Sequence, residues 1–203
     1  MAVGITGASG AAYATRTLAS LLSRGYHVEL VITEFGRRLI LDELGEQTNP
    51  DQFMSFLTER YGSEVSRGEL TVWSNKDLGA GIASGSHRCD GMVIVPCSMK
   101  TLSAIVSSYS NNLLLRAADV VLKERRKLVL MPREAPLHVG HCRLLYEAAQ
   151  MGAVIAPPMP AFYNRPGTVE DIVNHSVGRV LDLFDVESGV VRRWSGNDPE
   201  SLT

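Results

Sequence analysis

The chain of 203 residues is long enough for one domain with a full core, and its 45% apolar and 21% charged residues are typical of a globular protein. A net charge of −2 gives no electrostatic reason to expect nucleic acid or an anionic membrane as a partner, and no apolar run is long enough to cross a bilayer. Three cysteines form no disulfide framework, and the N-terminus enters a glycine turn without a signal peptide, so we expect a cytoplasmic protein.

Strands and helices alternate along the chain. Strands are predicted at residues 2–6, 26–32, 70–73, 91–95, 128–131 and 153–156. Helices are predicted at 11–23, 35–44, 50–61, 98–108, 113–126 and 141–151, with a last helix that begins at Thr168, where Thr168 and Asp171 resemble a capping box. Glycine and proline indicate loops at 78–91 and 157–167. This pattern predicts an α/β three-layer sandwich, Rossmann-like (flavodoxin-like), with a parallel sheet and helices on both faces. We expect one domain over residues 1–188 and a tail over 189–203.

The first strand runs into GITGASGAAYA, residues 4–14, which places three glycines at three-residue spacing. This is neither the dinucleotide pattern G-x-G-x-x-G nor a Walker phosphate loop, and the short-chain dehydrogenase pattern fails as well. Small residues still let the backbone approach a ligand, Ser9 adds a hydroxyl, and a helix start near Gly10 offers N–H groups to an anion. A tight turn without any ligand is an equally good interpretation of this stretch alone.

A second turn of the same kind is VPCSMKT, residues 95–101, at the end of an apolar strand. Ser98 and Thr101 could cap the next helix and present N–H and O–H groups to an anion. Two such turns after two parallel strands can hold one flat phosphorylated ligand. Cys97 is interpreted as a small residue under the turn rather than as a nucleophile, because no histidine lies near it in the sequence.

Charged and phenolic residues follow the later elements. Arg133 and Glu134 come directly after the fifth strand, and Arg116 and Lys123 lie seven residues apart on one helix face. The proline-rich loop carries Tyr163 and Arg165, and Arg179 follows in the last helix. Arg133 and Glu134 alone could be a surface ion pair of little energetic consequence, and a solvated basic face is the better interpretation of Arg116 and Lys123 alone.

The histidine pattern gives no reason to predict a metal site. His138 and His141 form H-x-x-H beside Cys142, but further ligands are not evident in the sequence. A histidine pair at the start of a helix more often has a structural role.

Six motifs together resemble the UbiX-type flavin prenyltransferases. They are GASG at 7–10, ASGS at 83–86, PCSMKT at 96–101, RAADVVLKERR at 116–126, PREAPL at 132–137 and AFYNRP at 161–166. The resemblance runs from the N-terminus to about Trp194. Related FMN-dependent cysteine decarboxylases carry a P-A-S-A-N-T-like segment where this chain has PCSMKT, which favours prenyl transfer.

The resemblance implies a reaction. Reduced FMN would be alkylated by dimethylallyl phosphate at flavin N5, with ring closure at C6, and the prenylated FMN would pass to a partner UbiD-type decarboxylase. No metal would be needed, which agrees with the lack of D-D-x-x-D clusters in this sequence. The resemblance also implies a homo-oligomer, a dodecamer with sites at subunit interfaces.

Residue roles follow from the resemblance by position. Gly7, Ala8 and Ser9 would cradle FMN, with Thr33 near its phosphate or ribityl chain. The second wall and the arginine that reaches the flavin or the substrate phosphate would be Ser98, Met99, Lys100, Thr101 and Arg133. Dimethylallyl phosphate would be held by Tyr163 and Arg179, with Arg116 and Lys123 from a neighbouring subunit. The candidate acid–base residues are Glu134 and Glu43, and Tyr163 is counted with them as catalytic because it would serve the departing phosphate.

Two alternative functions stay open. One is an FMN-dependent decarboxylase that acts directly on a carboxylate substrate. The other is a non-catalytic flavin-binding subunit of an aromatic acid decarboxylase complex. The sequence does not identify the pathway or the receiving decarboxylase.

Overall fold

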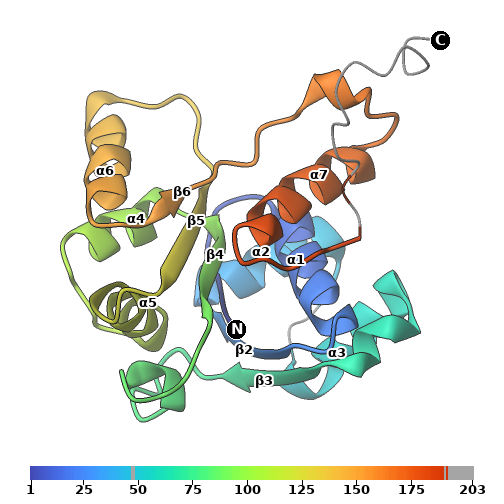
Figure 1. Ribbon diagram of the computed structural model, residues 1–203, viewed down its shortest axis with the longest axis horizontal. Coiled ribbons are helices and arrows are strands. Elements are labelled where there is room, and N and C mark those ends of the chain that lie inside the picture. Colours follow the sequence, from blue (N-terminus) through green and yellow to red (C-terminus); the bar gives the residue numbers. More distant parts are fainter. Residues whose placement is uncertain (47–48, 190, 192–203) are drawn as a thin grey trace.

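The computed structural model describes residues 1–46, 49–189 and 191, and these form an α/β sandwich around one parallel sheet (Figure 1). The strands are β1 (Ala2–Ile5), β2 (His27–Ile32), β3 (Glu69–Trp73), β4 (Gly91–Cys97), β5 (Lys127–Pro132) and β6 (Val154–Ile155). Their order across the sheet is β3-β2-β1-β4-β5-β6, and every neighbouring pair is parallel. The predicted fold class is therefore confirmed, and the strand order reverses between β1 and β4.

Helices cover both faces of the sheet (Figure 1). One face carries α1 (Ala11–Ser23), α2 (Glu34–Leu44), α3 (Pro50–Tyr61) and α7 (Val169–Asp182). The other face carries α4 (Met99–Val106), α5 (Leu113–Lys123) and α6 (Val139–Gln150). Short 3-10 segments are η1 (Ser63–Arg67), η2 (Gly81–Ala83) and η3 (Phe162–Asn164). No helix within the described ranges has the length and apolar character that a membrane crossing requires.

The apolar runs of the central strands are buried on both faces. In β4, Val93 and Val95 pack with α1 and α7, whereas Met92 and Ile94 pack with α4 and α5. Such a strand has no solvent face, which is why its sequence is continuously apolar rather than alternating. In β1, a Cβ added at Gly4 would lie 3.0 Å from Leu114 Cδ1, so glycine allows α5 to pack closely on the strand.

Element boundaries depart from the predicted ones where side chains cap helices. Helix α6 begins two residues earlier than expected because the His138 ring accepts the N–H of Gly140 at 3.0 Å. The ring of the same histidine also contacts the tilted ring of His141, with centroids 3.6 Å apart, which gives the H-x-x-H pair a structural role. The capping box of Thr168 and Asp171 is confirmed. The predicted tail lies outside the described residues except at 189 and 191.

Candidate functional site

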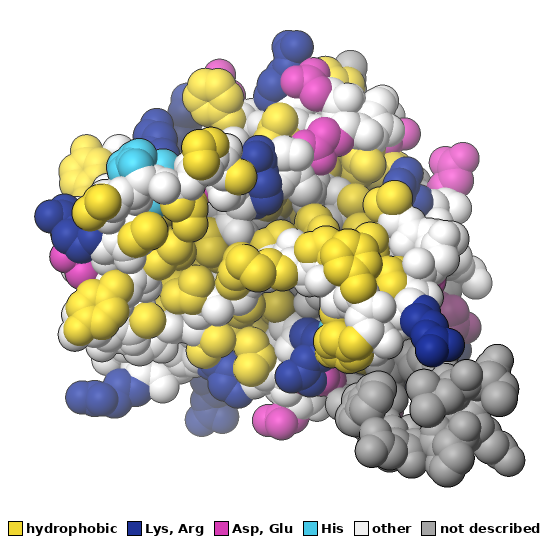
Figure 2. All heavy atoms as spheres, turned by 90° about the horizontal axis from the view of Figure 1, so that it is seen from above, with side chains coloured by type: hydrophobic (Ala, Val, Ile, Leu, Met, Phe, Trp, Pro, Cys, Tyr) yellow, Lys and Arg dark blue, Asp and Glu magenta, His cyan; other side chains and the backbone are white. Residues whose placement is uncertain are grey.

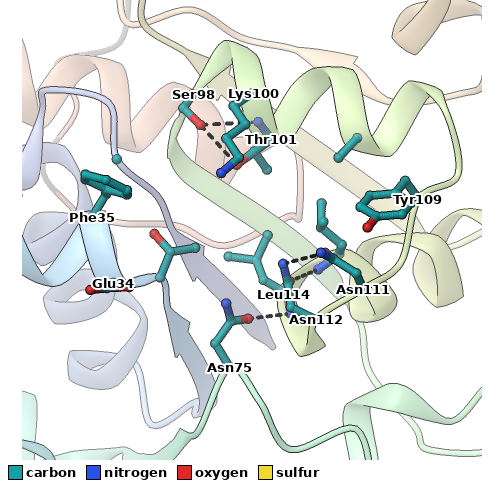
Figure 3. Close-up of a pocket in the computed structure, with 14 residues that line it drawn as sticks. Glu34, Phe35, Asn75, Ser98, Lys100, Thr101, Tyr109, Asn111, Asn112 and Leu114 are labelled. Atoms are coloured by element: carbon teal, nitrogen blue, oxygen red, sulfur yellow. Dashed lines mark hydrogen bonds between the residues drawn. The ribbon is translucent and has the colours of Figure 1, made fainter.

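A cavity of about 370 Å³ opens where the first four strands end (Figure 3). It lies where the strand order reverses, between the tips of β1 and β4, which is the usual ligand site of a doubly wound sheet. The residues that line it are Gly7, Thr33, Glu34, Phe35, Asn75, Ser98, Lys100, Thr101, Ala104, Tyr109, Asn111, Asn112, Leu114 and Leu115. Five of the predicted site residues are among them: Gly7, Thr33, Ser98, Lys100 and Thr101.

The wall formed by α2 depends on two glycines. A Cβ at Gly7 would lie 2.5 Å from Phe35 Cβ, and a Cβ at Gly36 would lie 2.7 Å from the Ile5 carbonyl oxygen. Helix α2 can therefore start directly against the β1–α1 turn, where Thr33 caps it by accepting the Gly36 N–H at 3.1 Å. Phe35 is 70% exposed and presents a flat aromatic surface at this wall (Figure 3).

The opposite wall begins at Ser98, the N-cap of α4. Its Oγ accepts the Thr101 N–H at 3.2 Å and donates to Thr101 Oγ1 at 3.0 Å. Its N–H donates at 2.8 Å to Oγ1 of the buried Thr6, which in turn donates to the Pro96 carbonyl at 2.8 Å. Thr6 thus joins the tips of β1 and β4 beneath the cavity. Lys100 supplies a cation at the rim.

Asparagines form a third side that sequence reasoning missed. Asn75 Oδ1 accepts the Leu114 N–H at 3.0 Å, and Asn112 caps α5 by accepting the Leu115 N–H at 3.0 Å. Asn111 and Tyr109 complete this side (Figure 3). An asparagine directly before the apolar run 113–115 is a helix-start signal, but nothing local in the sequence places Asn75 here.

The N-terminus of α1 is already occupied by an anion. The Glu43 carboxylate accepts the Gly10 N–H at 3.0 Å and the Ala11 N–H at 2.7 Å. These are the N–H groups that the sequence led us to expect would serve a ligand anion. Glu43 therefore acts as a cap contributed by α2, and that carboxylate interacts favourably with the positive end of the α1 dipole.

Arg133 and Ser9, both of which the resemblance assigns to the site, lie close together. Arg133 Nε donates to the Ser9 carbonyl at 3.3 Å, so the guanidinium extends from the β5 tip to the β1–α1 turn. Glu134 is exposed beside it, and its Oε1 accepts the Ala135 N–H at 3.1 Å. The side chains of Ala8 and Met99 are buried, so these two residues can offer a ligand only backbone groups.

Tyr163 and Arg179 lie outside the lining of the cavity in one protomer, but both lie next to His175. The Tyr163 ring meets the His175 ring edge-on, with centroids 6.0 Å apart, and Arg179 Nη1 donates to Asp182 at 2.9 Å. Desolvation and then the positive charge of Arg179 lower the pKa of His175. His175 therefore lies against the Tyr163 ring and close enough to Arg179 to feel its charge.

Arg116 and Lys123 lie on α5 away from the cavity, facing the segment that follows η2. Arg116 Nε donates to the Ala83 carbonyl at 3.1 Å, and Nη1 donates to Asp119 at 2.9 Å. Lys123 forms an ion pair with Glu124. Within one protomer these two cations do not line the cavity.

The thiol of Cys97 is fully buried at the end of β4. Burial raises its pKa to about 12, so it stays protonated at neutral pH and is a poor nucleophile. The interpretation of Cys97 as a packing residue under the turn agrees with this geometry. No cluster of three or more metal-ligating side chains forms within the described ranges.

Comparison with known proteins identifies the relatives of this chain. The Flavoprotein family model matches residues 1–181. Flavin prenyltransferase UbiX from Thauera aromatica is 48% identical over 200 residues, which cover 98% of this chain and 96% of that protein. The crystal structure of AnUbiX (PadA1) in complex with FMN and dimethylallyl pyrophosphate has 41% identity and a TM-score of 0.85, with 97% of each chain covered. A dodecameric FMN-dependent UbiX-like decarboxylase from Escherichia coli O157:H7 has 41% identity and a TM-score of 0.84, with 96% of this chain and 98% of that chain covered. The chain therefore belongs to the Flavoprotein family and, within it, to the UbiX-type flavin prenyltransferases.

Proposed function

We propose that this protein joins the dimethylallyl group of dimethylallyl phosphate to N5 and C6 of reduced FMN. The observation that carries the proposal is the cavity between β1 and β4, which has one aromatic wall, one hydroxyl-rich wall and a cation at its rim. A flat ring system with a phosphorylated tail needs these three features together. The family to which the chain belongs supports the same chemistry.

The residues present fit FMN as a substrate. Because Gly7 has no Cβ, Phe35 packs directly against the β1–α1 turn, and the two together form a wall for a ring system. We assign ring and ribityl contacts to the 7–9 turn and Thr33, and polar contacts to Ser98, Lys100 and Thr101. Met99 and Ala8 would contribute backbone N–H groups, and Arg133 would reach the flavin or the substrate phosphate from the Ser9 side.

The substrate phosphate requires cations that one protomer does not place in the cavity. We propose that Tyr163, Arg179, Arg116 and Lys123 meet at this site in a homo-oligomer, a dodecamer as in the E. coli relative. Exposed apolar side chains support an assembly: Val139, Met159, Phe162 and Val169 are 71–87% exposed. Figure 2 views the molecule from the top of Figure 1 and shows apolar side chains gathered over the surface that faces the viewer. Contiguous exposed apolar surface of this kind marks an interaction site.

The proposed donors act on the leaving group. As the allylic C–O bond breaks, its electron pair leaves with the phosphate while positive charge develops on the carbon. Phenolic and cationic donors stabilise the first charge, and electron-rich aromatic surface stabilises the second. Monophosphate is a poorer leaving group than diphosphate, so several donors are needed.

Closing the ring at C6 adds a proton to the double bond of the dimethylallyl group and removes the proton from C6, and we assign this proton transfer to a carboxylate. Glu134 is the exposed carboxylate beside Arg133, and it fits the role of general base. Glu43 is the second candidate, but its carboxylate already caps α1. We further propose that the product serves a UbiD-type decarboxylase and that the reaction takes place in the cytoplasm.

The proposed function is tested with purified protein, reduced FMN and dimethylallyl phosphate under anaerobic conditions, followed by mass spectrometry of the extracted flavin. A flavin heavier by one prenyl group is the expected result. Release of carbon dioxide from a test acid without a partner would instead support an FMN-dependent decarboxylase. Bound but unmodified FMN would support a flavin-binding subunit.

A further inference from the structure

A buried carboxylate lies in the sheet, away from the cavity. Glu29 of β2 is 4% exposed and is the one acidic or basic side chain that is buried among the described residues. Its Oε2 lies 2.7 Å from His87 Nε2, and its Oε1 accepts the Trp73 Nε1–H at 3.3 Å. The proposed reaction uses none of these three residues.

The cost of burying this carboxylate is offset by its two partners. An uncompensated buried charge strongly destabilises a fold, whereas an apolar residue would suit a strand whose neighbours Val28 and Leu30 are fully buried. Trp73 comes from the adjacent strand β3, so its bond lies within the sheet. His87 belongs to the segment after η2, so its bond ties a loop to the sheet.

The same loop is held from its other side by arginines. Arg126 donates to the carbonyl oxygens of Gly85 at 2.8 Å and His87 at 2.7 Å, and Arg116 donates to the Ala83 carbonyl at 3.1 Å. Residues 83–87, here called the anchor loop, are therefore fixed between Glu29 and the arginines of α5 and of the segment that follows it. A Cβ at Gly85 would lie 2.6 Å from Lys123 Nζ, so the loop also packs against that amine.

We propose that Glu29 and His87 are a positioning pair that sets the orientation of Arg116 and Lys123 through the anchor loop. This inference rests on the proposed function, in which those two cations bind the substrate phosphate. Since Arg116 Nε is aligned by the Ala83 carbonyl, a shift of the loop changes the direction of the guanidinium. The flavin cavity has no lining residue from the anchor loop, so flavin binding does not depend on the pair.

The test compares His87→Ala, which removes the bond to Glu29, with His87→Gln, which keeps an N–H donor of similar reach. His27→Ala is the matched control, because His27 lies on the same strand as Glu29 but bonds Thr71 at 2.9 Å and not the loop. We expect His87→Ala to raise the KM for dimethylallyl phosphate roughly 10-fold, with the FMN Kd within about twofold of wild type. His87→Gln should recover most of the loss, and His27→Ala should leave both constants unchanged.

A readout independent of turnover accompanies the kinetics. Hydrogen–deuterium exchange should rise in His87→Ala at residues 83–87 and 116–123, and not around the cavity. If His87→Ala folds poorly because Glu29 loses its partner, the double variant Glu29→Gln/His87→Ala removes the buried charge and is measured in the same way.

Two results would overturn the positioning role: an unchanged KM with unchanged exchange, or a KM that rises only in step with the FMN Kd and a lowered Tm. Failure of the wild-type protein to form prenylated flavin would remove the proposed function instead. The exchange data would then still decide whether the pair holds the loop.

Discussion

The hydroxyl of Thr6 accepts the N–H of Ser98 at 2.8 Å, so a residue at the end of β1 fixes the first residue of the turn after β4. The same hydroxyl donates to the Pro96 carbonyl at 2.8 Å. One buried oxygen thus sets the spacing of the two turns that flank the cavity.

Thr6→Val should lower both stability and FMN affinity. Valine keeps the shape but leaves the Ser98 N–H and the Pro96 carbonyl without this partner, at a cost of about 1–3 kcal/mol. Thr17→Val is the matched control, since Thr17 is equally buried but bonds only the Tyr13 carbonyl of its own helix. Thermal unfolding and FMN titration measure the two effects. Equal FMN affinity in both variants would show that Thr6 does not set the spacing of the turns.

Gly7→Ala should weaken FMN binding by displacing the Phe35 wall. The new methyl would lie 2.5 Å from Phe35 Cβ, a separation that real Cβ atoms do not tolerate. We expect a loss of affinity of roughly 10-fold, on the scale of overpacking costs of about 1–3 kcal/mol. Because the methyl meets the Phe35 Cβ itself, Phe35→Ala should not rescue the loss, whereas Phe35→Gly should relieve the clash. Gly45→Ala, which meets nothing within 4 Å but strains a φ of 75°, should lower Tm without changing FMN affinity.

Glu134→Gln should keep FMN binding and slow product formation in a single turnover. Removing a general base lowers the rate by about 10²–10⁴-fold. Glu43→Gln should mainly lower stability, by about 1 kcal/mol, because the carboxylate is the cap of α1. Rapid-quench mass analysis and thermal unfolding separate the two roles. A normal rate in Glu134→Gln together with a slow rate in Glu43→Gln would contradict this assignment and make Glu43 the general base.

Tyr163→Phe should raise the requirement for dimethylallyl phosphate. Loss of one donor to a leaving phosphate is expected to raise the KM or lower kcat/KM by roughly 10²-fold. Tyr146→Phe is the control, since Tyr146 has the same 63% exposure but lies on α6 and bonds Gln150. Saturation curves at fixed FMN give the comparison. Superimposable curves for the two variants would separate the proline-rich loop from the substrate.

Cys97 should resist alkylation at pH 8, whereas the exposed Cys142 should react. Burial raises the pKa of Cys97 from 9.0 to about 12, so the folded chain keeps a proton that the unfolded chain releases. Stability from this group is therefore complete below pH 9 and is lost as the pH rises toward 12. Peptide mapping after iodoacetamide treatment checks the reactivity. Modification of Cys97 in the folded protein, or loss of turnover in Cys97→Ala without a change in Tm, would instead indicate that Cys97 acts as a nucleophile.

The sheet could be predicted from sequence because its central strands are buried on both faces. Runs such as 91–95 and 128–131 are explained by burial on both faces of the sheet, and the turn segments PCSMKT (96–101) and PREAPL (132–137) follow them directly. Ends of helices were less predictable where a capping side chain decides them, as His138 does for α6.

The site was only partly predictable. Strand tips gather by topology, and Gly7, Thr33 and Ser98 line the cavity at these tips. The Glu43 carboxylate accepts the N–H of Ala11, 32 residues earlier in the chain, and no local sequence pattern predicts this contact. Asn75 is held at the cavity by its bond to the Leu114 N–H of α5, 39 residues further along the chain, so no local sequence pattern predicts its position either. The family resemblance, and not strand topology, assigned substrate-binding roles to Tyr163, Arg179, Arg116 and Lys123. A single protomer does not bring these residues to the cavity.

The cap on α1 also bears on which cofactors the protein can admit. In dinucleotide-binding sheets of this strand order, the diphosphate bridge rests on the first helix N-terminus. Here the Glu43 carboxylate occupies that position, with its Oε2 2.7 Å from the Ala11 nitrogen. NAD or FAD would bring like charge against it, whereas a mononucleotide can direct its one phosphate elsewhere. The Glu43 carboxylate therefore opposes the diphosphate bridge of a dinucleotide at this turn, although the strand order is one that dinucleotide-binding folds share.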